Sequence, residues 1–298
     1  MDSSPLPNCG EVWVISSYPD NISVVENGFL AGNNLNELIE IYMDDLVGEK
    51  AFELNNKEFP LLIKFIDADD WLSIQVHPDD KLAQKYQFPN GKSEMWYVMH
   101  SEKNSQLISG FKRDSNSKEY LKCLEDKKLD EILNYEDTHK GDVFDIPAGR
   151  VHALGPGNLI AEIQQTSDLT YRIYDWDRVD EKGKGRELHL TKAMEAMNFK
   201  AEKEYKTEYP DTKNETVNTV KCPYFTTNVL SLTLAIEKDY SELDSFVVYL
   251  CTEGKGTLKY NDGEMKVNPG DAILLPATTE KIGLYPDHYM HLLEVMLL

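Results

Sequence analysis

The sequence predicts a mainly β protein made of two jelly-roll β-sandwich units, with helical insertions in the first unit. Two similar segments, Gly141–Ala148 and Gly270–Ala277, each read as a Gly-Asp turn, an apolar strand and a closing Pro-Ala. A Gly-Asp turn into a strand that proline ends is typical of double-sheet jelly rolls. In the second unit, the segment Glu253-Gly254-Lys255-Gly256 supplies glycines for a hairpin turn.

The order of elements supports this architecture, which resembles the cupin superfamily. Short apolar or alternating runs separated by turn residues predict strands, and the helical spacing of apolar residues predicts helices in a few segments. The charged, apolar-poor stretch 201–218 divides a first cupin-like domain, residues 1–205, from a C-terminal cupin-like jelly roll, residues 206–298. The predicted helices are 35–46, with Asn33 or Asn34 as the cap, 117–135, with Ser117 as the cap, and 187–197.

Composition narrows the class of protein. The chain has 298 residues, of which 41% are hydrophobic, enough for a real core. No apolar run approaches the roughly 20 residues that a membrane span needs. The start, Met1–Pro5, has no basic or apolar stretch, so we expect no secretory signal and a cytoplasmic location. The four cysteines lack the close spacing of a metal knuckle or redox motif and are expected to be reduced.

The charge of the chain limits its partners. A formal net charge of −21 repels nucleic acid and anionic lipid, so we expect neither a nucleic-acid nor a membrane partner. The same charge repels any anionic substrate at long range. An anion site on this chain therefore requires a local cluster of lysine or arginine.

One strand carries a row of polar side chains. Successive side chains of a strand point to opposite faces. In residues 72–77, Leu72, Ile74 and Val76 share one face, while Ser73, Gln75 and His77 share the other. Pro78 then ends the strand. Three polar side chains in a row on one face suggest a site.

Two later segments add to this pattern. Lys92, Glu94 and Trp96 lie on one face of a strand, and His152 follows the strand-ending Pro147 closely. If a barrel brings these faces together, Gln75, His77, Glu94 and His152 offer two imidazole nitrogens and two oxygens. Zinc accepts histidine and carboxylate ligands, whereas glutamine is an unusual zinc ligand. Ligand chemistry alone therefore does not exclude iron or manganese as the bound metal.

These motifs resemble type I mannose-6-phosphate isomerase (phosphomannose isomerase) in its short bacterial form. The resemblance reaches from near the N-terminus to about residue 200. The C-terminal part resembles the second jelly roll of the family only in general features. The matching segments are Gly10–Ser16, Phe59–Lys64, Ser73–Asp80, Gly91–Tyr97, Pro147–Ala153, Gln164–Arg172 and Arg186–Leu190. Members usually carry a further Trp-Gly-Gly stretch before the first segment, so we expect a first strand to be absent, which affects stability more than chemistry.

The resemblance implies a role for each residue of the constellation. It implies one zinc ion per chain, held by Gln75, His77, Glu94 and His152. It places the active-site arginine at Arg172, and it places Ser73 and Lys92 in the substrate pocket together with Arg172. The remaining histidines, His100, His139, His189, His288 and His291, receive no role in this site.

The activity that the resemblance implies is the interconversion of mannose 6-phosphate and fructose 6-phosphate through an enediol. A base must carry a proton between C2 and C1. Lys92 is our candidate, because its pKa can fall beside zinc and Arg172; a zinc-bound hydroxide or another carboxylate are alternatives. Two other functions stay open: an isomerase of another sugar phosphate, and a non-catalytic sugar-binding cupin.

Overall fold

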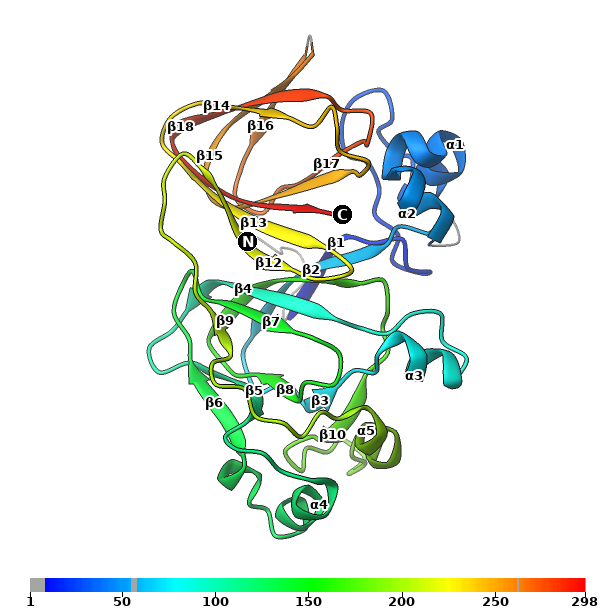
Figure 1. Ribbon diagram of the computed structural model, residues 1–298, viewed down its shortest axis with the longest axis vertical. Helices are drawn as coiled ribbons and strands as arrows, with labels where there is room; N and C mark the ends of the chain where they lie inside the picture. The colour runs from blue at the N-terminus through cyan, green and yellow to red at the C-terminus, as the bar shows by residue number, and fades with distance from the viewer. Residues whose placement is uncertain (1–8, 55–57, 262, 298) are drawn as a thin grey trace. The chain divides into compact units, whose positions relative to one another are not determined.

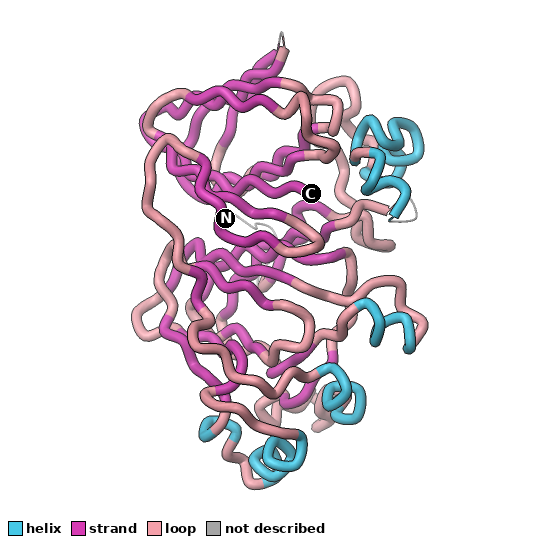
Figure 2. Tube along the Cα trace, viewed as in Figure 1, coloured by secondary structure: helices cyan, strands magenta, loops and turns pink. Residues whose placement is uncertain are grey.

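A computed structural model of the chain describes residues 9–54, 58–261 and 263–297, and these ranges are mainly β (Figures 1 and 2). The chain divides into two compact units. One holds Ile63–Thr207 with a short N-terminal stretch ending at Val12, and the other holds Trp13–Leu62 and Glu208–Leu298. Met1–Pro5 lies outside the described residues. No helix within the described ranges is long and apolar enough to span a bilayer.

The division differs from the predicted one at the N-terminal side. The predicted boundary at 205/206 lies close to the observed change at 207/208, but residues 13–62 group with the C-terminal jelly roll. Local contacts explain this grouping. The Asp244 carboxylate accepts hydrogen bonds from the backbone N–H groups of Glu49 and Lys50, at 2.7 and 3.2 Å, and the rings of Phe59 and Phe246 lie 4.4 Å apart.

The unit containing Ile63–Thr207 is built around two antiparallel sheets that pack face to face. Apolar side chains from both sheets, including Trp96, Phe144 and Leu154, form the core between them. The first sheet has the order β1 (Glu11–Ile15), β2 (Leu61–Ala68), β9 (Asn158–Gln165), β4 (Glu94–Ser101), β7 (Val143–Ile146), β11 (Lys206–Thr207). The second has the order β10 (Tyr171–Tyr174), β3 (Ile74–Val76), β8 (His152–Leu154), β5 (Gln106–Phe111), β6 (Leu133–Asp137).

Helical segments cover the outer face of the second sheet. Ile74 and Val76 of β3 pack with Tyr120 of α4 and Ala193 of α5 in a separate apolar cluster. The interior face of the same sheet is therefore left to the polar residues that alternate with them. The helical segments of this unit are α3 (Asp80–Lys85), α4 (Ser117–Glu125), the 3₁₀ turn η1 (Leu129–Glu131) and α5 (Leu190–Ala196).

The predicted helix 117–135 is wrong in its second half. Helix α4 ends at Glu125, and the chain then passes through η1 into strand β6. Lys127 adopts a positive φ of 57°, which a continuing helix does not permit. The cap is Asn116 rather than Ser117, because the Asn116 side chain accepts hydrogen bonds from two backbone N–H groups of the first turn.

The other unit is an antiparallel jelly roll preceded by two helices. Its core includes Leu230, Tyr249, Leu258 and Leu292. The predicted Asn34 cap is confirmed, with a capping box in which Asn34 and Glu37 bond reciprocally. The elements are α1 (Leu35–Val47), α2 (Glu49–Leu54) and a sheet of order β12 (Thr216–Lys221), β13 (Thr226–Leu232), β18 (Lys281–Met296), β15 (Val247–Tyr260), β16 (Gly263–Val267), to which β14 (Ile236–Asp239) and β17 (Ala272–Leu275) add.

The two Gly-Asp segments form the same turn in the two units. Gly141 and Gly270 both adopt a φ of 92°, a conformation that favours glycine. In each turn the aspartate carboxylate accepts a hydrogen bond from the backbone N–H three residues earlier, at 2.7 Å for Asp142 and 2.8 Å for Asp271. Each turn leads into a four-residue strand, β7 or β17. The internal repeat seen in the sequence is therefore a structural repeat.

The glycines of the segment 253–256 do not form the predicted hairpin turn. Strand β15 runs through them without interruption and pairs along its length with β18. The register shifts on either side of Gly254, so these glycines form bulges that bend one long strand. Sequence spacing alone cannot separate a turn from a bulge, because both need glycine at positive φ.

Replacing Gly254 by alanine is expected to destabilise the protein by about 3 kcal/mol or more. Gly254 has a φ of 70°, and a Cβ there would stand 2.1 Å from the carbonyl oxygen of Tyr289. Gly183→Ala is the control: its φ is 76°, but a Cβ there meets no atom within 4 Å, so only about 1 kcal/mol of backbone strain is expected. Urea unfolding of both variants checks this, and equal losses would contradict the bulge argument.

Candidate metal centre

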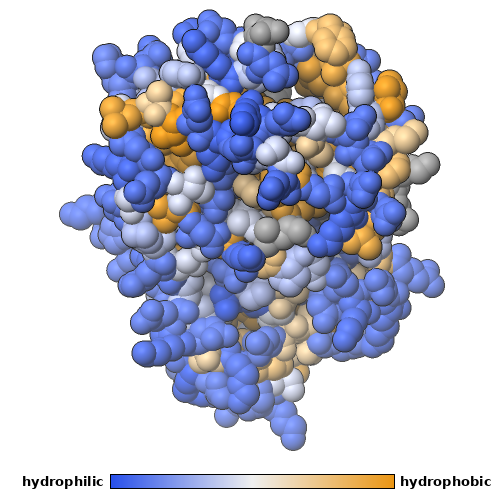
Figure 3. Space-filling model, turned by 45° about the horizontal axis from the view of Figure 1, so that its top comes forward, coloured by the Kyte–Doolittle hydropathy of each residue, from blue (hydrophilic) through white to orange (hydrophobic). Residues whose placement is uncertain are grey.

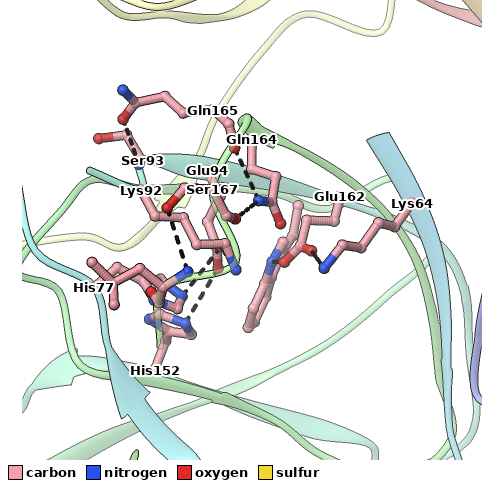
Figure 4. A network of polar contacts seen from close by, with 12 residues as sticks. Lys64, His77, Lys92, Ser93, Glu94, His152, Glu162, Gln164, Gln165 and Ser167 are labelled. Atoms are coloured by element: carbon pink, nitrogen blue, oxygen red, sulfur yellow. Dashed lines mark hydrogen bonds and ion pairs between the residues drawn. The ribbon is translucent and has the colours of Figure 1, made fainter. Parts of the chain in front are cut away.

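Three side chains from both sheets of the first unit converge between the sheets. Glu94 is the first residue of β4, His152 is the first residue of β8, and His77 directly follows β3. All three side chains are buried, with exposed fractions of 0 to 1%. Figure 4 shows the two imidazole rings side by side below the Glu94 carboxylate. The predicted convergence of the faces carrying His77, Glu94 and His152 is confirmed.

Backbone contacts fix the orientation of both imidazole rings. Nδ1 of His77 lies 2.9 Å from the Leu169 carbonyl oxygen, and Nδ1 of His152 lies 2.9 Å from the Arg150 carbonyl oxygen. A carbonyl oxygen only accepts, so each Nδ1 carries the hydrogen and each Nε2 presents a lone pair. These are the contacts that set the tautomer of a metal-ligating histidine.

The Nε2 atoms face the carboxylate of Glu94. His77 Nε2 lies 3.4 Å from Oε2, and His152 Nε2 lies 3.2 Å from Oε1. The two Nε2 atoms and Oε1 of Glu94 are buried without a hydrogen-bond partner among the described residues, whereas Oε2 of Glu94 also faces the Lys92 ammonium. Burial, and then the charge of Lys92, lowers the pKa of His77 to about 3, and burial lowers that of His152, so both rings are neutral.

This geometry fits a divalent cation. Lone pairs of neutral imidazoles that face carboxylate oxygens repel one another unless a cation lies between them. The ligand atoms of His77, Glu94 and His152 all lie within 4.8 Å of one another. Two imidazoles and a carboxylate are a donor set that zinc accepts, with room for a further ligand.

Gln75 lies next to this cluster in the sheet. Its Cα is the register partner of His152 on β8 and of Arg172 on β10. Ile74 and Val76 point to the outer cluster, so the alternation leaves Gln75 to the interior face. Ser73, just before the strand, is buried. Leu72 departs from the predicted pattern: it packs on the interior cluster, because β3 begins only at Ile74.

Lys92 is buried beside the carboxylate. Its Nζ lies 3.0 Å from Oε2 of Glu94. Burial lowers the pKa of Lys92, but Glu94 and then Glu162 raise it, and the net direction is upward. The fall expected beside zinc and Arg172 together stays a prediction. The nearest charge is a carboxylate, which stabilises the ammonium form.

Arg172 lies on β10 and is held by the chain that follows it. Its Nη1 donates to the Glu187 carbonyl oxygen at 3.0 Å, and its backbone N–H donates to Nδ1 of His189 at 3.2 Å. Its Nε is buried and has no hydrogen-bond partner among the described residues. Sequence reasoning gave His189 no role, yet its ring supports the strand that presents Arg172.

Sequence reasoning missed a second buried ion pair next to the cluster. Lys64 Nζ lies 3.5 Å from Oε2 of Glu162, whose Oε1 accepts a hydrogen bond from the Trp96 indole at 2.9 Å (Figure 4). Burial and then Glu94 raise the pKa of Glu162. The available signal was a charged residue inside each of two apolar strands, at Lys64 in 61–66 and Glu162 in 158–165.

The other unit also buries a glutamate, with a different outcome. Glu294 is fully buried and accepts hydrogen bonds from Asn228 at 2.7 Å and from Tyr249 at 2.9 Å, as well as from Tyr240. Lys238 lies 2.8 Å from the same carboxylate. Both oxygens have donors from the chain, so this carboxylate is satisfied without a metal. The candidate metal centre belongs to the unit containing Ile63–Thr207.

The fold and the site define a cupin with a buried His-Glu-His cluster able to hold a metal ion. The sequence matches the family models for the phosphomannose isomerase type I catalytic domain over residues 3–95 and for the mannose-6-phosphate isomerase cupin domain over residues 215–285. It is 35% identical to mannose-6-phosphate isomerase ManA of Bacillus subtilis, over 91% of this chain and 85% of that protein. The chain belongs to the type I mannose-6-phosphate isomerase family.

Further relatives agree with this assignment. Mannose-6-phosphate isomerase of Streptococcus mutans is 33% identical over 92% of this chain and 84% of its own length. The crystal structure of mannose 6-phosphate isomerase from Bacillus subtilis matches with a TM-score of 0.85 at 31% identity, covering 96% of this chain and 89% of that one. A phosphomannose isomerase structure from Salmonella typhimurium, 15% identical with a TM-score of 0.77, covers 96% of this chain and 90% of that one and shares the fold. The prediction of cupin-like jelly rolls is confirmed.

Proposed function

We propose that this protein is a zinc-dependent aldose-ketose isomerase that interconverts mannose 6-phosphate and fructose 6-phosphate through an enediol. The observation that carries the proposal is the Glu94 carboxylate facing the Nε2 lone pairs of His77 and His152 in a buried site. Curated relatives named mannose-6-phosphate isomerase cover most of the chain and supply the substrate pair.

The proposed metal ligands are His77, Glu94 and His152, with Gln75 as the fourth. The amide of Gln75 is the weakest donor of the set, and its register position opposite His152 supports its inclusion. When bound, zinc supplies a Lewis acid that polarises the substrate carbonyl and its neighbouring hydroxyl. The first sheet contributes Glu94 and the second sheet the other three, so the two faces of the sandwich fix the ligand geometry.

The remaining site residues have proposed roles in binding and proton transfer. Arg172, with its unsatisfied Nε, holds the substrate or stabilises the enediolate oxygen. Ser73 lines the pocket as a neutral hydrogen-bonding group. Lys92 carries the proton between C2 and C1. Because Glu94 favours its ammonium form, Lys92 first gives a proton to the substrate carbonyl oxygen, and the neutral amine then takes the C2 proton, which completes the enediol. The reverse transfers, a proton to C1 and a proton back from the C2 hydroxyl, restore the ammonium.

A coupled isomerisation assay tests the proposal. The protein is assayed with mannose 6-phosphate after loading with zinc and again after treatment with a chelator. Turnover that zinc restores supports the proposal. Turnover only with another hexose phosphate identifies an isomerase of a different sugar phosphate, and no turnover with any member of the panel in the metal-loaded protein identifies a sugar-binding cupin without catalysis.

Arg172→Ala is expected to lower kcat by about a hundredfold with zinc retained, because a preorganised cation at the developing oxyanion is lost. Zinc retention is expected because the hydrogen bonds of Arg172 go to Glu187 and His189, which are not among the proposed ligands. Steady-state kinetics and metal analysis of the same preparation check this. Unchanged kcat removes Arg172 from the mechanism.

A further inference from the structure

A buried ion pair of the first sheet has no role in the proposed chemistry. Few charged side chains of the described residues are buried, and the face drawn in Figure 3 is largely hydrophilic. Lys64 and Glu162 are exceptions, with side chains only 7% and 4% exposed. Removing two charges from water costs free energy that their mutual attraction often does not repay. The contacts of this pair show what it holds in place.

The pair holds an indole ring that contacts a proposed metal ligand. Oε2 of Glu162 lies 3.5 Å from the Lys64 ammonium, and Oε1 accepts the Trp96 indole N–H at 2.9 Å (Figure 4). The Trp96 ring meets the His152 imidazole, with the ring centroids 5.3 Å apart and the planes at 86°. This edge-to-face arrangement is a favourable geometry for two aromatic rings. Contacts thus run from Lys64 through Glu162 and Trp96 to His152.

Strand register builds this series of contacts. Trp96 on β4 is the direct partner of Glu162 on β9. Strand β2, which carries Lys64, is the neighbour of β9 on the other side. These three side chains come from the first sheet, whereas His152 begins β8 of the second sheet. The indole therefore connects the two sheets at the His-Glu-His cluster.

The imidazole of His152 needs more than one contact to hold its orientation. The contact between Nδ1 and the Arg150 carbonyl oxygen, at 2.9 Å, fixes one edge of the ring. A ring held at Cβ and Nδ1 can still tilt about the line through these two atoms, which moves Nε2 away from Glu94. The perpendicular Trp96 ring opposes this tilt by close packing. Outer contacts of this kind orient the ligands of metal sites.

The other jelly roll contains the same aromatic-glutamate pair. Tyr249 on β15 is the direct partner of Glu294 on β18, and its hydroxyl donates to Oε1 of Glu294 at 2.9 Å. Trp96 pairs with Phe144, two residues after the aspartate of the first Gly-Asp turn. Tyr249 pairs with Ile273, two residues after the aspartate of the second turn. The two pairs therefore occupy equivalent positions of the repeat.

The two pairs differ in what lies next to them. Glu94 pairs with Ile146 on β7, and the residue at the equivalent position of the other unit is Val247, which pairs with Leu275 on β17. Within residues 9–54, 58–261 and 263–297, the His-Glu-His cluster is the one histidine- and carboxylate-containing group close enough to hold a metal ion. The other unit thus keeps the aromatic-glutamate pair where there is no metal ligand to orient.

We propose that Trp96 is a positioning residue for the metal ligand His152, and that Glu162, held by Lys64, fixes the tilt of the indole for this purpose. The proposal rests on the proposed function, which makes His152 a zinc ligand. The ion pair then acts on the metal site through the indole ring. Tyr249 makes the same kind of bond to a glutamate but belongs to the core of its own unit.

Trp96→Phe tests the proposal, with Tyr249→Phe as the matched control. Each variant keeps an aromatic ring, deletes one buried donor to a buried glutamate and leaves the charge of the protein unchanged. Both are expected to lower the urea midpoint of unfolding. Only Trp96→Phe is expected to weaken zinc binding, by about tenfold in competition with a chelator. The visible absorption of the cobalt-substituted protein, which reports ligand geometry, is expected to change only in Trp96→Phe.

Glu162→Gln and Glu162→Met form a second pair of variants, which decides the question if Trp96→Phe does not fold. Both remove the charge of Glu162, but only glutamine keeps an oxygen that accepts the indole N–H. We expect the methionine variant to bind zinc about tenfold more weakly than the glutamine variant. Equal zinc binding in these two variants overturns the proposal, as does wild-type zinc affinity with an unchanged cobalt spectrum in a folded Trp96→Phe protein.

Two further outcomes separate this proposal from its alternatives. Equal weakening of zinc binding in Tyr249→Phe and Trp96→Phe overturns it, because lost stability alone then accounts for the effect. A wild-type protein that binds zinc without turnover refutes the isomerase function alone, since the zinc affinities still decide the role of Trp96. A wild-type protein that binds no zinc refutes the ligand assignment, and the positioning role with it.

Discussion

His77→Ala and His152→Ala are each expected to remove both bound zinc and isomerase activity while the fold survives. Each substitution deletes one of the two Nε2 lone pairs that face Glu94. Loss of even an outer contact to a metal ligand weakens binding by about 10- to 100-fold, so loss of a ligand is expected to cost at least a hundredfold. Metal analysis after dialysis, activity and circular dichroism measured on one preparation check the three parts of this expectation.

His100→Ala provides the control for that experiment. His100 lies on β4, the strand that begins with Glu94, but its side chain is exposed. This variant is expected to keep wild-type zinc content and turnover. Full zinc occupancy in His77→Ala or His152→Ala contradicts the ligand assignment. Lost zinc with retained turnover contradicts instead the dependence of catalysis on the metal.

The sequence predicted the alternating faces of residues 73–77 because their signal is local. Alternation along residues 73–77 depends only on strand geometry, and β3 presents Ile74 and Val76 to the outer cluster as expected. The repeated Gly-Asp turns are equally local, since each needs one glycine at positive φ and one aspartate side chain. Features set by a few neighbouring residues were therefore predicted correctly.

Features that depend on partners distant in the sequence were not predicted correctly. The apolar spacing in residues 117–135 suits a helix, but Leu133 belongs to β6 because it pairs with Phe111 on β5. The glycines near 254 form bulges because β18 runs opposite β15 through the whole segment. Residues 13–62 group with the C-terminal jelly roll through Asp244 and Phe246. None of these partners can be read from the local pattern.

The charge state of Lys92 in the site likewise depends on contacts that the local sequence does not reveal. Its position two residues before Glu94 does not reveal that Nζ turns back to the carboxylate at 3.0 Å. Nor does the sequence reveal that Glu162, on β9, adds a second negative influence. These two carboxylates oppose the fall of the pKa that is expected beside zinc and Arg172, and that fall stays a prediction.

Replacing Lys92 by methionine is expected to lower kcat by about 10²- to 10⁴-fold, the usual contribution of a positioned acid or base. Methionine keeps much of the buried side-chain volume but cannot hold a proton. The nitrogen atoms and oxygens proposed to bind zinc stay in place, so zinc content is expected to remain at the wild-type level. Stopped-flow or single-turnover kinetics measure the effect on turnover, and metal analysis measures zinc content separately.

Lys92→Arg separates proton transfer from simple charge. Arginine keeps a positive group beside Glu94, but its pKa is too high for it to release a proton during turnover. If Lys92 moves the proton, the arginine variant is expected to be nearly as slow as the methionine variant. Wild-type turnover in Lys92→Arg means that the site needs only a cation beside Glu94. The proton carrier must then be sought elsewhere, and Glu162, whose pKa burial raises, is the buried carboxylate to test next.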